Sequence, residues 1–208
     1  MWIRPAGPRG VLVECDDLAQ VMALHRALAA DRPVGVVDLV PAARTVLVTF
    51  DETTTRGRLE AHLRQAVDRP SPPDGPATRP GDVVEIDVAY DGADLEEVAA
   101  QTGLTTAEVV RRHTDRTYVV AFCGFSPGFG YLVGADPALT VPRRASPRPR
   151  VPAGSVALAG EFTGVYPRSG PGGWQLIGHT TARLWDLDRE PPALLAPGTR
   201  VRFARVAP

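Results

Sequence analysis

The sequence predicts an α+β protein in which a small unit of helices and sheet precedes a closed or nearly closed β-barrel. Three observations support this prediction. Strand-type and helix-type patterns alternate through residues 11–67, a proline-rich stretch follows, and short strand-like segments then recur between turns. The 20 glycines and 21 prolines among 208 residues agree with it, because this composition favours strands and turns over a helix bundle.

Hydrophobic periodicity defines the first unit. An apolar strand pattern leads to Asp16 or Asp17, and either carboxylate can cap the helix that follows, which runs to about Ala30. Three strands and two helices are expected in this order, at 11–15, 17–30, 34–40, 45–50 and 55–67. The order β-α-β-β-α predicts a ferredoxin-like α/β unit.

A linker is predicted from Arg69 to Gly81. This segment holds five prolines and two glycines, with almost no apolar side chain larger than alanine. We therefore expect a domain boundary near residue 78, so that one domain comprises residues 1–78 and the other residues 79–208.

The second domain opens with an alternating strand pattern at 83–90. Asp94 opens a short helix that Gly103 ends, and Thr105 with Glu108 predicts a capping box at the next helix. No helix pattern follows Gly124. Short strands separated by turns predict the barrel, at 118–122, 155–159, 174–179 and 200–205.

Composition excludes several classes of function. A net charge of −1 provides no basic surface for nucleic acid or an anionic membrane, and no apolar run is long enough to span a bilayer. Without a signal-peptide pattern, we expect a cytoplasmic protein. Every residue of the Lys/Arg class is arginine, which excludes lysine chemistry and a phosphate-loop lysine. Cys15 and Cys123 lie far apart and the histidines lack ligand spacing, so no metal site is expected.

Glycine, proline and aromatic residues are concentrated at 122–180, where we expect the functional site. Four arginines lie among prolines that hold the chain extended, and arginine binds carboxylates or phosphates through paired hydrogen bonds: Arg143, Arg144, Arg148 and Arg150. The same cluster fits a solvated loop, or arginines paired with carboxylates of a partner chain. Gln175 and Trp174 follow a glycine turn; either they line a pocket, or Trp174 is core and Gln175 faces water.

Other candidates leave the catalytic residues unassigned. Ser155 is interpreted as a turn serine, because the Gly-x-Ser-x-Gly pattern of a nucleophile elbow is absent. Cys123 and His179 form a nucleophilic pair only if folding brings them together, and buried free cysteines are usually inert. Glu161 is either a general base or a loop residue.

Several motifs follow one another in a defined order: Leu39–Ala42, Val48–Asp51, Phe125–Leu132, Pro142–Arg144, Val151–Val156, Gly164–Pro167 and Pro171–Gly178. Together they resemble the allophanate hydrolase subunit 1 family over nearly the whole chain. That family includes the B subunit of bacterial ATP-dependent 5-oxoprolinases and an inhibitor of a sporulation histidine kinase. His179 stands where many members carry arginine.

The resemblance implies a cyclophilin-like β-barrel without implying prolyl isomerase activity. It further implies that the chain is active only in a complex with two partners, a C subunit of the allophanate hydrolase subunit 2 type and an A subunit. That complex opens 5-oxoproline to glutamate with ATP as co-substrate, bound with the partner subunits. The implied substrate-binding residues are Arg143, Arg144, Arg148, Arg150, Gln175 and His179.

Three alternatives remain open at the level of sequence. The chain is compatible with a binding module that inhibits a sensor histidine kinase. It is also compatible with a carboxyltransferase or allophanate-type subunit of a urea-degrading system. A third possibility is a scaffold that completes the active site of a partner.

Overall fold

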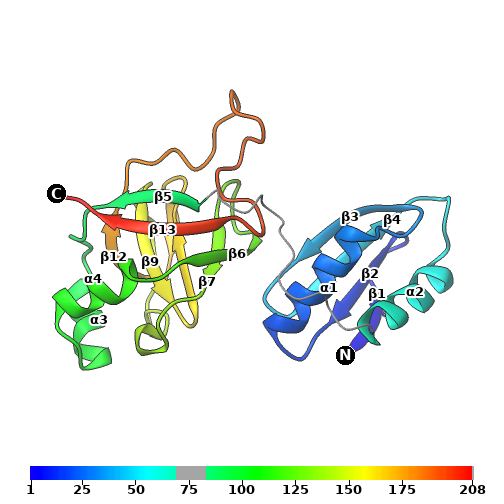
Figure 1. Ribbon diagram of the computed structural model, residues 1–208, viewed down its shortest axis with the longest axis horizontal. Helices are drawn as coiled ribbons and strands as arrows, with labels where there is room; N and C mark the ends of the chain where they lie inside the picture. The colour runs from blue at the N-terminus through cyan, green and yellow to red at the C-terminus, as the bar shows by residue number, and fades with distance from the viewer. Residues whose placement is uncertain (69–82, 208) are drawn as a thin grey trace. The chain divides into compact units, whose positions relative to one another are not determined.

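The computed structural model describes residues 1–68 and 83–207, which belong to two compact units, 1–77 and 78–208 (Figure 1). The predicted boundary near residue 78 lies outside the described residues, as does the predicted linker.

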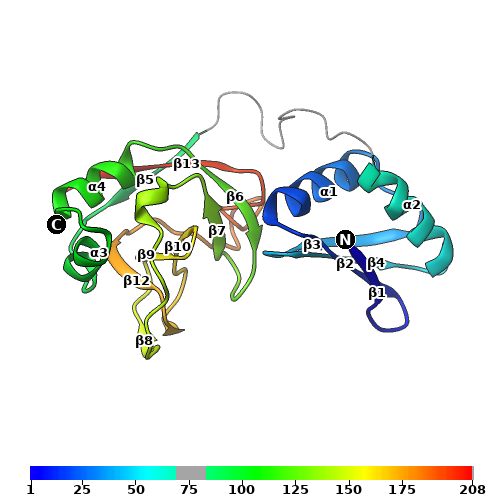
Figure 2. The same ribbon diagram turned by 90° about the horizontal axis from the view of Figure 1, so that it is seen from below.

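The first unit is a four-stranded antiparallel sheet with two helices on one face (Figure 2). Asp17 caps the first helix, because its carboxylate accepts a hydrogen bond from Gln20 N at 2.8 Å. The strands follow the spatial order β1-β2-β4-β3. The elements are β1 Trp2–Pro5, β2 Gly10–Glu14, α1 Leu18–Ala30, β3 Val36–Pro41, β4 Thr45–Phe50 and α2 Arg56–Asp68.

Strand β1 was not expected from the sequence. It has only four residues, three of which are exposed, so it carries no alternation of apolar and polar side chains. The other strands and both helices confirm the predicted order. Their buried faces meet in one core, which includes Val11, Val46, Leu28 and Leu63.

The second unit is built on a seven-stranded sheet with the order β12-β9-β10-β7-β6-β13-β5. Its two edge strands meet, because Ala89 and His179 exchange backbone hydrogen bonds at 2.9 and 2.8 Å. The sheet is therefore nearly closed into a barrel. The strands are β5 Val83–Val88, β6 Tyr118–Cys123, β7 Gly130–Val133, β9 Ser155–Ala159, β10 Phe162–Val165, β12 Gln175–His179 and β13 Arg200–Arg205.

Shorter elements surround this barrel. Helix α3 (Leu95–Thr102) ends at Gly103, whose φ of 69° is the left-handed conformation expected of such a cap. Helix α4 (Thr106–Thr114) begins with the predicted capping box of Thr105 and Glu108. A 3₁₀ helix of three residues, η1 (Pro137–Leu139), is too short to produce a periodic pattern. Strands β8 (Arg148–Val151) and β11 (Gly170–Gly172) pair in a separate ribbon.

The barrel interior is apolar, with Ile86, Val120, Leu158 and Phe203 almost fully buried. His113 lies among them without exposure and stacks on Phe203 at 4.5 Å between ring centroids. Within the described residues, no helix is long and apolar enough to cross a membrane.

Candidate functional site

The corner between β5 and α3 places a buried carboxylate against strand β12. Asp94 occupies the N-cap position of α3, but its side chain makes no capping hydrogen bond. Its backbone N–H donates to Leu176 O at 2.9 Å, and Leu176 N donates to Asp94 Oδ2 at 2.7 Å. A Cβ atom on Gly92 would collide with the backbone of Ile177 and Gly178, so glycine permits this close approach.

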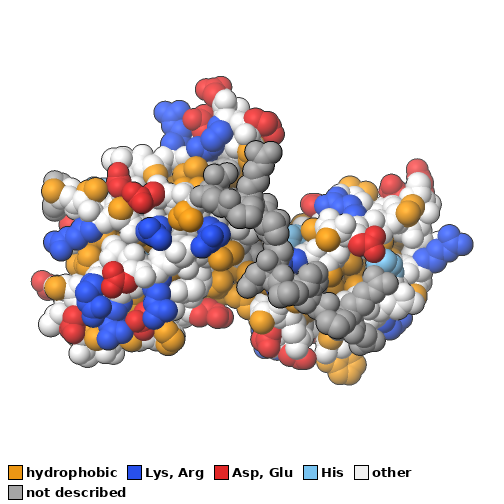
Figure 3. All heavy atoms as spheres, viewed as in Figure 1, with side chains coloured by type: hydrophobic (Ala, Val, Ile, Leu, Met, Phe, Trp, Pro, Cys, Tyr) orange, Lys and Arg blue, Asp and Glu red, His pale blue; other side chains and the backbone are white. Residues whose placement is uncertain are grey.

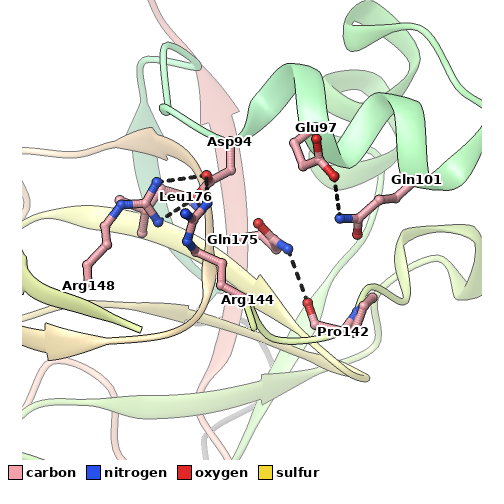
Figure 4. A network of polar contacts seen from close by, with 8 residues as sticks. All are labelled: Asp94, Glu97, Gln101, Pro142, Arg144, Arg148, Gln175 and Leu176. Atoms are coloured by element: carbon pink, nitrogen blue, oxygen red, sulfur yellow. Dashed lines mark hydrogen bonds and ion pairs between the residues drawn. The ribbon is translucent and has the colours of Figure 1, made fainter. Parts of the chain in front are cut away.

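Two arginines from the segment before and within β8 converge on this carboxylate (Figure 4). Arg144 Nη1 donates to Asp94 Oδ1 at 2.6 Å. Arg148 binds both oxygens, with Nη2 2.7 Å from Oδ1 and Nη1 2.9 Å from Oδ2. The Asp94 side chain is 3% exposed, against 34% and 23% for Arg144 and Arg148. Two guanidinium charges on one carboxylate leave a surplus positive charge at a partly open surface, which can attract an anion.

The arginines keep Asp94 ionised. Burial acts to raise the pKa of its carboxyl group, because a charge in an apolar environment is poorly solvated. The hydrogen bonds from Arg148 and Leu176, together with the charges of Arg148 and Arg144, outweigh burial and hold the pKa below its usual range. The sequence identified Asp94 only as the start of a helix, because nothing local distinguishes a capping aspartate from one that binds distant arginines.

Ion pairs at the α3–α4 end of this unit differ from the Asp94 cluster. Figure 3 shows acidic and basic side chains intermixed there. Arg111 and Asp115 are 3.5 Å apart with 59% of each side chain exposed. Such exposed pairs contribute about 0–1 kcal/mol, because water solvates both charges in the unfolded and folded states. The Asp94 cluster has a buried acceptor instead, so its geometry is more strongly determined.

Gln175 lies beside the arginine cluster. Its Nε2 donates to Pro142 O at 3.3 Å, and Arg144 N donates to Gly173 O at 2.7 Å, so two bonds tie this loop to β12 and the turn before it. Gln175 is 2% exposed, and its Oε1 is buried without a hydrogen-bond partner among the described residues. Figure 4 shows the carboxamide between the Asp94–Arg144 contact and Pro142.

Trp174 belongs to an aromatic cluster and not to a pocket wall, since it is 5% exposed. Phe129 contacts the rings of Tyr166 and Trp174 edge to face, at 5.3 and 5.4 Å between centroids. Gly164 and Gly172 make room for these rings: a Cβ on Gly164 would lie 2.9 Å from Phe129, and one on Gly172 would overlap the Tyr166 hydroxyl. The glycine and aromatic density of the sequence is therefore partly explained by packing.

The remaining predicted binding residues lie outside this cluster. Arg143 is exposed, and Arg150 Nε donates to Ser169 Oγ at 3.1 Å. His179 Nδ1 lies 2.7 Å from Asp91 Oδ1, with both side chains about half exposed. Folding thus gathers Arg144, Arg148 and Gln175 around Asp94, and leaves Arg143, Arg150 and His179 without a shared contact.

The other candidates are arranged as structural residues. Cys123 Sγ donates to Leu195 O at 3.1 Å, and burial raises the pKa of the thiol to about 11. Cys123 and His179 therefore have different partners. Ser155 is 5% exposed at the start of β9, and Glu161 is exposed in the turn between β9 and β10.

A family model described as "Carboxyltransferase domain, subdomain C and D" matches residues 1–195. The chain belongs to this carboxyltransferase-domain family. It is 54% identical over 123 residues to the B subunit of 5-oxoprolinase from Escherichia coli O157:H7, covering 58% of this chain and 56% of that protein. It is 50% identical over 128 residues to the protein of the same name from Bacillus subtilis (strain 168), covering 60% and 53%. The matched regions thus span little more than half the length of these relatives.

Some solved structures of similar fold are much longer than this chain, and one has about the same length. TTHA0988 is 40% identical with a TM-score of 0.76, and the match covers 96% of this carboxyltransferase-domain chain but 40% of that chain. The conserved uncharacterized protein PH0987 from Pyrococcus horikoshii is 34% identical with a TM-score of 0.59, covering 99% and 98%. The Kluyveromyces lactis urea carboxylase is 20% identical with a TM-score of 0.71, covering 99% and 22%, which shows a common fold alone.

Proposed function

We propose that this chain is the B subunit of an ATP-dependent 5-oxoprolinase, which opens 5-oxo-L-proline to L-glutamate with ATP hydrolysis. The observation that carries the proposal is its 54% identity to the B subunit of a 5-oxoprolinase. The Asp94 cluster supports it, because the substrate carries one carboxylate and the cluster offers one surplus positive charge.

The chemistry explains the need for ATP. A lactam is a stable amide, and transfer of the terminal phosphoryl group to its oxygen makes the ring carbon more electrophilic and releases ADP. Water then adds to that carbon and the ring C–N bond breaks, which leaves the acyl phosphate of glutamate. A second water hydrolyses this acyl phosphate and releases inorganic phosphate. In this scheme the present chain binds and orients the substrate. The substrate-binding residues proposed are Arg144, Arg148 and Gln175 at the centre, with Arg143, Arg150 and His179 at the margin.

The partners are proposed from the same relationship. The proposed partners of this chain are an A subunit and a C subunit of the allophanate hydrolase subunit 2 type. ATP is proposed to bind in the assembled complex, and the complex is proposed to act in the cytoplasm. TTHA0988 supports a partner, since more than half of that chain extends beyond the region matched here. We also propose the ferredoxin-like and cyclophilin-like classes for the two units, which the strand orders support.

The test is reconstitution. The A and C subunits are purified with this chain, and glutamate release from 5-oxoproline is measured with and without ATP. We expect ATP-dependent release, and a loss of about 10- to 100-fold in kcat/KM for Arg148→Ala, as for removal of a charge-assisted hydrogen bond. Arg202→Ala is the matched control, because Arg202 is exposed on β13. The absence of turnover from the full set, while a known complex is active in the same assay, contradicts the proposal.

Carboxyl transfer is the second candidate, favoured by the description of the matching family and by the common fold with urea carboxylase. It predicts that the assembled complex transfers a carboxyl group to an amide acceptor such as urea. Incorporation of labelled bicarbonate into the acceptor measures this reaction. Glutamate release without any such incorporation favours the 5-oxoprolinase.

A further inference from the structure

Gln175 presents an acceptor without a donor. Gln175 is 2% exposed, and its Oε1 has no hydrogen-bond partner among residues 1–68 and 83–207. Buried acceptors of this kind are rare, because desolvation without a new hydrogen bond is costly. The orientation of the amide is determined by Pro142, whose carbonyl oxygen requires the Nε2 donor and leaves Oε1 as the free atom.

This acceptor adjoins the surplus positive charge of the Asp94 cluster. Gln175 directly precedes Leu176, whose backbone N–H donates to Asp94. The side-chain nitrogen of Gln175, Nε2, donates to the carbonyl oxygen of Pro142, which lies two residues before Arg144. Figure 4 shows the carboxamide next to the Arg144 guanidinium, with its oxygen on the side of the cluster and its nitrogen on the side of Pro142. A ligand that satisfies both features has an anionic group and an N–H donor close together.

The charge state of that N–H donor follows from the residues present. A neutral amide oxygen suits a neutral N–H, whereas an ammonium group is better matched by a carboxylate and is repelled by the surplus charge. In 5-oxoproline the lactam N–H is bonded to the carbon that carries the carboxylate. In the product glutamate an ammonium group takes its place. A neutral acceptor beside a surplus positive charge therefore suits the closed ring better than the opened product.

We propose that Gln175 is a specificity-determining residue whose Oε1 accepts the lactam N–H of 5-oxoproline, while Arg144 and Arg148 bind its carboxylate. This inference rests on the proposed function and names the group that recognises the substrate. It also explains release of the product, because ring opening converts the recognised neutral donor into a cation.

The test compares two ligands that differ at one atom. 5-Oxoproline has a ring N–H, and 5-oxotetrahydrofuran-2-carboxylate has a ring oxygen in its place. Calorimetry on the assembled complex measures the dissociation constant of each. The complex with the native chain is expected to bind the lactam about 10- to 100-fold more tightly than the lactone, the usual effect of one hydrogen bond to a buried group.

Gln175→Met preserves length and removes the acceptor, so the ratio of the two dissociation constants is expected to fall to about one. A purely structural effect of losing the Pro142 contact would weaken both ligands equally and leave the ratio unchanged. Gln175→Glu is expected to raise the affinity for L-glutamate relative to 5-oxoproline, because it supplies a charge for the ammonium group. Gln65→Met is the matched control, since Gln65 is exposed on α2 in the other unit.

The outcomes separate this inference from the function on which it rests. A ratio that is unchanged in Gln175→Met, or a complex that does not distinguish lactam from lactone, overturns the role of Gln175 even when turnover is normal. Water alone at Oε1 would give the same unchanged ratio. Tight, lactam-selective binding without glutamate release overturns the 5-oxoprolinase assignment and leaves the recognition site standing.

Discussion

Removal of the Asp94 carboxylate is predicted to destabilise the second unit strongly. Asp94→Ala leaves two guanidinium groups and the Leu176 N–H without their acceptor. Breaking a fully buried pair costs about 3–5 kcal/mol, and an unpaired N–H about 1–3 kcal/mol. Arg144 and Arg148 are 34% and 23% exposed, so water replaces part of the lost interaction. We expect a loss of about 3 kcal/mol for Asp94→Ala and about 1–2 kcal/mol for Asp94→Asn, which retains one acceptor.

Urea unfolding followed by tryptophan fluorescence measures this loss. Trp174 is buried in the second unit, whereas Trp2 is 70% exposed and changes its environment little on unfolding. Asp91→Asn is the matched control, because its contact with His179 lies between half-exposed side chains and contributes less than about 1 kcal/mol. A cost below about 1 kcal/mol for Asp94→Ala would refute the reasoning, since the arginines would then be held by other contacts.

The same residue predicts a pH dependence. The pKa of Asp94 is lowered in the folded chain, so its contribution is complete above the pKa of the unfolded carboxyl, about 4, and is lost as the pH falls through the folded value. The stability difference between the native chain and Asp94→Asn should therefore be constant from about pH 7 to 5 and shrink below about pH 4. A difference that persists unchanged at about pH 3 contradicts this linkage.

Four other substitutions test the structure. Gly92→Ala should destabilise the second unit, because the added Cβ would push the Asp94 corner away from β12. Gly57→Ala lies on an open helix surface and should stabilise the first unit by about 0.5–1 kcal/mol. Thermal unfolding of the two variants checks both predictions. Burial lowers the pKa of His113 to about 3, so only the unfolded chain gains its proton below about pH 6.5. Stability should fall by about 2 kcal/mol from about pH 6.5 to 5 through this residue, and His113→Gln should lose that part of the dependence in urea titrations. The raised pKa keeps the Cys123 thiol protonated, so it should react slowly with an aromatic disulfide at about pH 8. For the same reason, Cys123→Ala should leave turnover of the complex intact. Rapid labelling of Cys123 in the folded chain would contradict this.

The parts of the fold that sequence could predict depend on neighbouring residues. The capping box of Thr105 and Glu108 and the left-handed Gly103 are set by backbone groups within a few positions, so local rules identified both. Five strands escaped prediction because each has three or four residues, too few for a period to emerge: β1, β7, β8, β10 and β11. Strands β8 and β11 also depend on each other, although they lie far apart along the chain.

The candidate site likewise has a part that the sequence could predict and a part that depends on distant contacts. Proline spacing and arginine chemistry pointed to Arg144 and Arg148, but the sequence left open a solvated loop or a partner's carboxylates. The carboxylate lies instead in the same chain, 50 positions from Arg144 and 54 from Arg148. No periodicity or motif joins residues at such separations, because only the closing of the barrel brings β12 and the α3 corner together.

By itself, then, the sequence determined the class of the fold, the helix ends and the arginine-rich segment that holds Arg144 and Arg148, since all of these follow from short-range backbone and side-chain preferences. The tertiary structure alone decided that Asp94 binds arginines instead of capping its helix, that Trp174 is core, and that Gln175 Oε1 has no hydrogen-bond partner among the described residues. Those outcomes depend on which distant groups come into contact in the closed barrel, where burial makes each unsatisfied charge or dipole costly.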